Sequence, residues 1–153
     1  MLRLIGLVLV AGLLVGSESM QAASTSRIVK VLRHYLDQEG RHALSPSLLD
    51  RDAYQAQLRD HPEQVSGLRF DVQLRLKSKE VGNYRLRVEI RHGKGAQVGT
   101  FRKDLEIQRK RRSQWAKIPI LDEDFAQLNE VIAWRVLLLD GEAEVNTLES
   151  FLW

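Results

Sequence analysis

The stretch that decides the fold is LRFDVQLRLK, which runs from Leu68 to Lys77. Apolar residues alternate with charged or polar ones throughout it. Side chains of a β-strand point to opposite faces in turn, so this period of two predicts a strand with one buried face and one wet face. YRLRVEIR, from Tyr84 to Arg91, repeats the pattern and predicts a second strand of the same kind.

The rest of the C-terminal part predicts four more strands, at Val98–Gln108, Trp115–Leu121, Val131–Leu139 and Glu142–Trp153. In the first of these the apolar residues are irregular, which predicts a β-bulge between Thr100 and Lys103. A crossover with a helical turn is expected at 122–129, with Phe125 and Leu128 inward. These strands, each with one buried face, predict a mainly β domain over 66–153. It would be an antiparallel immunoglobulin/fibronectin-like β-sandwich of about six to seven strands.

A helical segment is predicted ahead of the sandwich, at 24–62. Its first part carries apolar residues at helical spacing, namely Ile28, Val31, Leu32, Tyr35 and Leu36, which predicts an amphipathic helix. A second helix is expected from Leu48 to Asp60, and Ser47 or Asp50 can cap its start. It should end before Pro62, because the residue before a proline avoids helical angles. We expect these helices to cover one sheet or an open sheet edge.

Residues 1–23 have the three parts of a secretory signal peptide. Arg3 supplies a positive charge, 4–15 is a run without a polar side chain, and small and polar residues follow. Cleavage is expected between Ser17 and Ser24, which would leave a periplasmic or secreted domain; an uncut signal would tether it to a membrane instead. The chain has no cysteine, so neither lipid attachment through cysteine nor a disulfide framework is expected.

Four stretches resemble a group of small exported bacterial proteins that is uncharacterised. They are LSPSLLDRDAYQAQLR at 44–59, SGLRFDVQLRLK at 66–77, VIAWRVLLLDG at 131–141 and ESFLW at 149–153. The resemblance implies an exported domain with helices ahead of an immunoglobulin-like sandwich. It implies no activity and no site residue.

Charge is distributed unevenly along the chain. Residues 66–118 hold fifteen Lys and Arg against five Asp and Glu, whereas 119–153 hold one against eight. Arg109, Lys110, Arg111 and Arg112 form the most conspicuous cluster, in the connection between two strands, where sandwich folds often bind ligands. Arg85 and Arg87 join them as candidate binding residues because they face outward on a predicted strand. If that strand paired with 68–77, their cations would share one basic face, which acidic residues of the C-terminal part could offset.

The sequence predicts no catalytic residue, no metal ligand and no cofactor. The four histidines are scattered, and none has a metal-ligand partner at helical spacing. The aromatic residues are expected in the core, Trp115 and Phe151 among them. We therefore expect first a non-catalytic binding or scaffolding module of the cell envelope, whose partner is an anionic envelope polymer or an acidic protein surface rather than nucleic acid. A self-associating structural domain and an enzyme with a hidden site are the alternatives.

Overall fold

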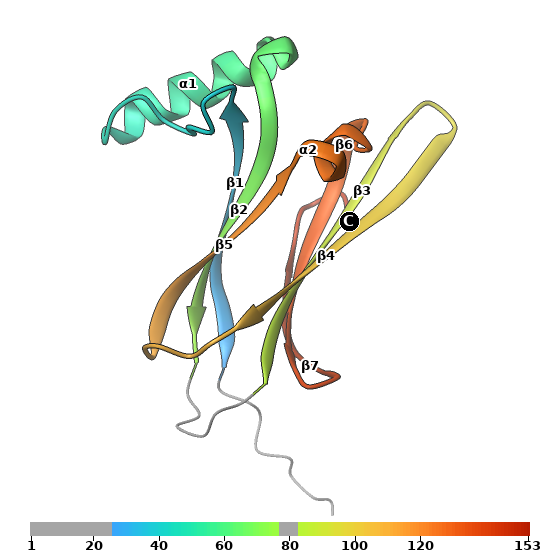
Figure 1. The fold of residues 1–153 in the computed structure, drawn as a ribbon. Coiled ribbons are helices and arrows are strands. Elements are labelled where there is room, and N and C mark those ends of the chain that lie inside the picture. The colour runs from blue at the N-terminus through green and yellow to red at the C-terminus, as the bar shows by residue number, and fades with distance from the viewer. Residues whose placement is uncertain (1–25, 77–82) are drawn as a thin grey trace, which may run out of the picture.

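The computed structural model describes residues 26–76 and 83–153. The predicted signal at 1–23 lies outside them, as does most of the connection predicted at 78–83. The elements are β1 (Arg27–Asp37), α1 (Leu48–Asp60), a 3-10 turn (Pro62–Gln64), β2 (Val65–Arg75), β3 (Tyr84–Lys94), β4 (Gln97–Ile107), β5 (Ser113–Leu121), α2 (Asp122–Ala126), β6 (Glu130–Asp140) and β7 (Ala143–Glu149). Figure 1 shows their arrangement.

Two antiparallel sheets pack face to face. Sheet A has the order β1-β2-β5 and sheet B the order β4-β3-β6-β7. The alternating residues that predicted β2 and β3 supply the inner faces, and both strands contribute fully buried side chains to one core. Phe70 of sheet A meets Trp134 of sheet B edge to face, with ring centroids 5.7 Å apart. The prediction of a mainly β fold with two packed antiparallel sheets is therefore confirmed.

The predicted first helix is wrong, because Arg27–Asp37 forms strand β1. It pairs antiparallel with β2, and its register shifts between Ile28 and Lys30. That shift changes which residues face inward, so Val31 and Tyr35 pack against the core. Leu36 is buried on the opposite face. Apolar residues on both faces of a strand with a register shift can have the same spacing as the apolar stripe of an amphipathic helix. With β1, the described residues form seven strands.

The predicted second helix is confirmed as α1. The Ser47 hydroxyl accepts a hydrogen bond from the Asp50 amide and caps its start. The side chain of Gln55 pairs with the edge of β1, since it accepts from the Tyr35 N–H at 2.8 Å and donates to the Tyr35 carbonyl at 2.9 Å. The helix thus covers part of an open sheet edge, as expected, and lies across one end of sheet A (Figure 1).

The predicted bulge in β4 is absent. Its register with β3 runs without a shift from Gln97 to Ile107. Lys103 lies in phase with the buried residues Phe101 and Ile107, and its ammonium group reaches Asp124 of α2 at 2.6 Å. A lysine on the inner face, rather than an extra residue, accounts for the irregular pattern. The prediction that Phe125 and Leu128 turn inward is confirmed, because both belong to the core or pack against it.

Two aromatic residues expected in the core lie outside it. The side chain of Trp115 is 49% exposed and Phe151 is fully exposed. The last strand ends at Glu149 rather than at Trp153, and the chain then turns back. Trp153 lies under two arginines of sheet B, with the guanidinium carbons of Arg135 and Arg91 4.6 and 5.5 Å from its ring centroid.

Candidate functional site

Residues Arg109–Arg112, which we call the basic loop, connect β4 to β5 at the end of the molecule opposite α1 (Figure 1). Gln114 holds the backbone of this loop. Its side-chain oxygen accepts from the amides of Lys110 at 2.9 Å and Arg111 at 3.2 Å, and its nitrogen donates to the Gln108 carbonyl. The Arg112 carbonyl accepts from the Leu76 amide at 2.8 Å. The loop therefore presents its cations from a fixed backbone.

The side chains of the basic loop make no ion pair with any residue in 26–76 or 83–153. Lys110, Arg111 and Arg112 are exposed. The Arg109 Nε atom is buried and has no hydrogen-bond partner in the described part of the chain. A hollow of about 330 Å³ beside the loop is lined by Lys110, Gln114 and Trp115 among others. A lysine and a half-exposed tryptophan thus line the same hollow.

Arg85 and Arg87 lie elsewhere, on the outer face of sheet B. Their strand, β3, does not pair with β2, which belongs to sheet A, so the single basic face considered from the sequence does not form. Arg87 binds Asp104 of β4 through two hydrogen bonds of 2.8 Å, and Arg85 binds Glu142 at 3.0 Å. The hydrogen bonds from Arg87 are the main reason that the pKa of Asp104 is lowered.

A second ion-pair cluster on the outer face of sheet B uses Glu89. Its buried carboxylate accepts from Arg102 of β4 at 2.9 Å and from Arg135 of β6 at 2.7 Å. Burial opposes ionisation of Glu89, but these two hydrogen bonds outweigh it and lower the pKa of the carboxyl group. The cations on this face, Arg85 and Arg87 among them, are therefore paired with acidic residues of neighbouring elements. In the described part of the chain, the cations of the basic loop have no such acidic partner.

A polar cluster that the sequence did not predict lies on the outer face of sheet A. His34 of β1, Asp71 of β2 and His42 of the β1–α1 connection each bring one ligand atom within 4.8 Å of the others. The His34 Nε2 atom is 3.8 Å from an Asp71 oxygen, and the two imidazole centroids are 4.8 Å apart. Arg69 donates two hydrogen bonds, of 2.7 and 2.9 Å, to the same carboxylate.

Burial is the main reason that the pKa of both imidazoles is lowered, which favours their neutral form. His34 is only 5% exposed, and burial lowers its pKa to about 4 despite the opposing charge of Asp71. Burial also lowers the pKa of His42, and the charges of Arg69 and Lys117 add to that effect. Neutral imidazoles expose nitrogen lone pairs, which is the form that binds metal ions. The sequence could have indicated this cluster only if Arg27–Asp37 had been predicted as a strand. The pairing of β1 with β2 places His34 diagonally across from Asp71.

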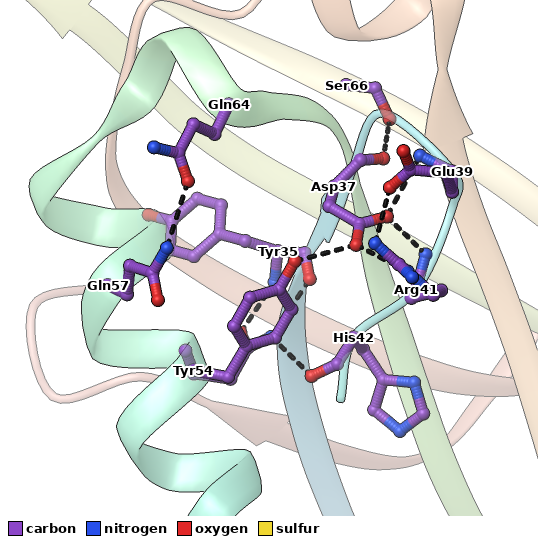
Figure 2. A network of polar contacts seen from close by, with 10 residues as sticks. Tyr35, Asp37, Glu39, Arg41, His42, Tyr54, Gln57, Gln64 and Ser66 are labelled. Atoms are coloured by element: carbon purple, nitrogen blue, oxygen red, sulfur yellow. Dashed lines mark hydrogen bonds and ion pairs between the residues drawn. The ribbon is translucent and has the colours of Figure 1, made fainter. Parts of the chain in front are cut away.

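A network centred on Asp37 fixes the connection that carries His42 (Figure 2). The buried Asp37 carboxylate accepts from the Tyr54 hydroxyl at 2.6 Å and from the Arg41 Nε at 2.8 Å. It also accepts from the amides of Glu39 and Arg41, and Ser66 of β2 donates to its main-chain carbonyl. One carboxylate thus ties β1, α1 and the turn between them together.

Asp37 gives the fold an acid-sensitive contribution. Burial raises its pKa, but the hydrogen bonds from Tyr54 and Arg41 outweigh burial and lower the pKa from 3.8 to about 2. Between these values the unfolded chain binds a proton that the folded chain does not, so stabilisation is complete above about pH 4 and is lost as pH falls through about 2. We expect the stability difference between the wild type and Asp37→Asn to shrink by about 1 to 2 kcal/mol between about pH 5 and pH 2. Urea unfolding at both pH values measures it, and a constant difference contradicts the assignment.

Comparison of the chain with protein-family models, with curated proteins and with solved structures finds no match. The resemblance to exported bacterial proteins therefore stays a prediction. None of the helices in 26–76 and 83–153 combines the length and apolar character that a membrane crossing needs.

Proposed function

We propose that this protein is a non-catalytic binding module, exported to the cell envelope, that holds an anionic polysaccharide at the basic loop. One observation carries the proposal: within residues 26–76 and 83–153 the cations of the basic loop have no acidic partner, while Gln114 fixes the backbone of the loop. Arg85 and Arg87, in contrast, are held by acidic neighbours. An ion pair formed within the domain leaves little charge for a partner, so the loop is the stronger ligand site.

The hollow beside the loop favours a sugar over other anions. Trp115 lines it together with Lys110, and its indole is half exposed. An aromatic face packs against the apolar face of a pyranose ring, whereas a cation beside it binds the carboxylate or sulfate of an acidic sugar.

The strand order agrees with an immunoglobulin/fibronectin-like sandwich, which we include in the proposal. The first, second and fifth strands form one sheet, and the third and sixth form the centre of the other, with the seventh at one of its edges. The fourth strand pairs with the third, as an added C′ strand does in variable-type domains. In such folds ligands commonly bind at the loops between strands, which is where the basic loop lies.

The first test removes two exposed charges, in the variant Lys110→Ser/Arg111→Ser. With a contribution of about 0.7 kcal/mol from each of the two exposed cations, we expect about tenfold weaker binding to polygalacturonate. Affinity chromatography on immobilised polygalacturonate, with elution by a salt gradient, measures the change. Retention of the wild type should also weaken when the salt concentration of the loading buffer is raised, because mobile ions screen exposed charges.

The matched control is Arg59→Ser/Lys94→Ser, which removes the same charge from two exposed residues far along the chain from the loop. Its retention should stay close to that of the wild type. Trp115→Ala should weaken binding to polygalacturonate but leave binding to polyphosphate unchanged, because only the sugar stacks on the indole. Equal retention of the loop variant and its control would reject the loop as the binding site, and equal loss on both polymers for Trp115→Ala would reject the sugar.

A further inference from the structure

We infer that His34, His42 and Asp71 form a binding site for a divalent transition-metal ion, with zinc as the best fit. This site is separate from the basic loop and does not depend on the proposed function. Zinc bonds to histidine nitrogen and carboxylate oxygen are about 2.0 to 2.2 Å long, so ligand atoms of a tetrahedral site lie about 3.4 Å apart. The His34 Nε2 atom and the Asp71 oxygen, 3.8 Å apart, need to approach by only a few tenths of an ångström.

The first two ligands come from neighbouring strands of sheet A. His34 and Asp71 lie on paired strands, with His34 opposite Arg69 and Asp71 opposite Leu32 in the register. Both residues are buried. Arg69 grips the Asp71 carboxylate with two hydrogen bonds and fixes its orientation. Carboxylates that bind metal ions are usually held in this way by a hydrogen-bonding neighbour, and Arg69 would be that neighbour here.

The third ligand is held by two anchors on its own backbone. The carbonyl of His42 accepts from Gln55 at 2.9 Å, and the preceding residue, Arg41, is bound to Asp37 through its amide and its side chain. The imidazoles of His34 and His42 themselves make no hydrogen bond with a residue in the described ranges. Rings whose backbone is fixed and whose nitrogens are unused are arranged as ligands are before a metal binds.

The charges around the site select the kind of metal. Arg69 neutralises Asp71, and Lys117 and Arg51 add positive charge near the histidines. Calcium and magnesium need several oxygen ligands with negative charge, so they should bind poorly here. Zinc, copper and nickel bind strongly to imidazole nitrogen, and two imidazoles with one carboxylate suit them. A water molecule or a ligand group would complete the coordination.

Calorimetric titration of the untagged full chain with zinc tests the site. We expect one zinc ion per chain, and at least tenfold weaker binding for His42→Ala, whose imidazole lies at the partly exposed side of the cluster. His61→Ala is the control, because His61 is exposed and pairs with Glu63, away from the cluster. Calcium should give no binding heat. Equal zinc affinity in His42→Ala and the wild type, or binding only at non-stoichiometric millimolar levels, would overturn the inference.

Nuclear magnetic resonance of the imidazole nitrogens gives a second readout. Zinc should shift the side-chain signals of His34 and His42 and leave those of His61 in place. His34→Gln keeps a polar group at the buried position and should also weaken zinc binding at least tenfold. If that variant unfolds, the result for His42→Ala still decides the question, and zinc-induced shifts confined to His61 would contradict the site.

Discussion

Phe70→Ala should lower the free energy of unfolding by about 3 to 5 kcal/mol, the largest effect we expect from a single substitution. Phe70 is completely buried on β2 and its ring meets Trp134 across the two sheets. Alanine removes the burial of the ring and leaves a cavity that rigid strands on both sides can fill only in part. Domains of this size are stable by about 5 to 15 kcal/mol, so the loss is a large share of the total. Urea unfolding followed by circular dichroism measures it.

Phe151→Ala is the matched control, because it removes the same side chain from a fully exposed position. Its stability should change by no more than about 0.5 kcal/mol. The pair also tests where the two aromatic residues lie. A loss from Phe151→Ala as large as that from Phe70→Ala would contradict both the exposed terminal turn and the Phe70–Trp134 contact as the centre of the core.

Asp37→Ala should cost about 2 to 4 kcal/mol and should loosen the whole β1–α1 connection. The substitution leaves the Tyr54 hydroxyl, the Arg41 side chain and two amides without their shared acceptor (Figure 2). Donors that lose a buried charged acceptor remain removed from water but no longer form a hydrogen bond, which destabilises the folded state. Equilibrium unfolding gives the cost, and hydrogen exchange at the amides of Glu39 and Arg41 reports the local opening.

Glu39→Ala is the control for that prediction. Glu39 also binds Arg41, but its side chain is exposed, and exposed ion pairs contribute between about 0 and 1 kcal/mol. The amides of the turn should keep their protection in this variant. If the two substitutions cost the same, the buried carboxylate is not what holds the connection. Because Arg41 precedes His42, Asp37→Ala should also weaken zinc binding at the cluster, whereas Glu39→Ala should leave it nearly unchanged.

The elements that could be predicted are those whose pattern has a single cause. β2 and β3 alternate cleanly because each has one face in the core, and α1 begins at a Ser47 cap and ends before Pro62. β1 was predicted as a helix because it packs on both faces. Its apolar residues serve the core on one side, at Val31 and Tyr35, and a second buried position on the other, at Leu36. A register shift between Ile28 and Lys30 adds the last feature of a helical spacing.

The site was harder to predict because it depends on register and on sheet membership. The local sequence pattern does not indicate that Arg87 lies opposite Asp104. That pairing neutralises Arg87 and makes it a weaker binding candidate than the basic loop. The cluster at His34 needs β1 to be a strand and the following connection to fold back over it. Both facts arise from long-range contacts, which a local period does not encode. The basic loop was visible because four adjacent cations require no partner to be recognised.

Lys103 has a consequence for how the molecule behaves among its own copies. β4 is an edge of sheet B, and an edge strand offers unpaired amides and carbonyls to any chain that arrives beside it. With an apolar residue at 103, every inward-facing side chain of β4 from Phe101 to Ile107 would be apolar. The inward lysine interrupts that apolar row, and Asp124 holds its ammonium group inside the native fold. A charged side chain on an edge strand disfavours pairing with a further strand, so we expect Lys103 to reduce edge-to-edge association between copies of the chain.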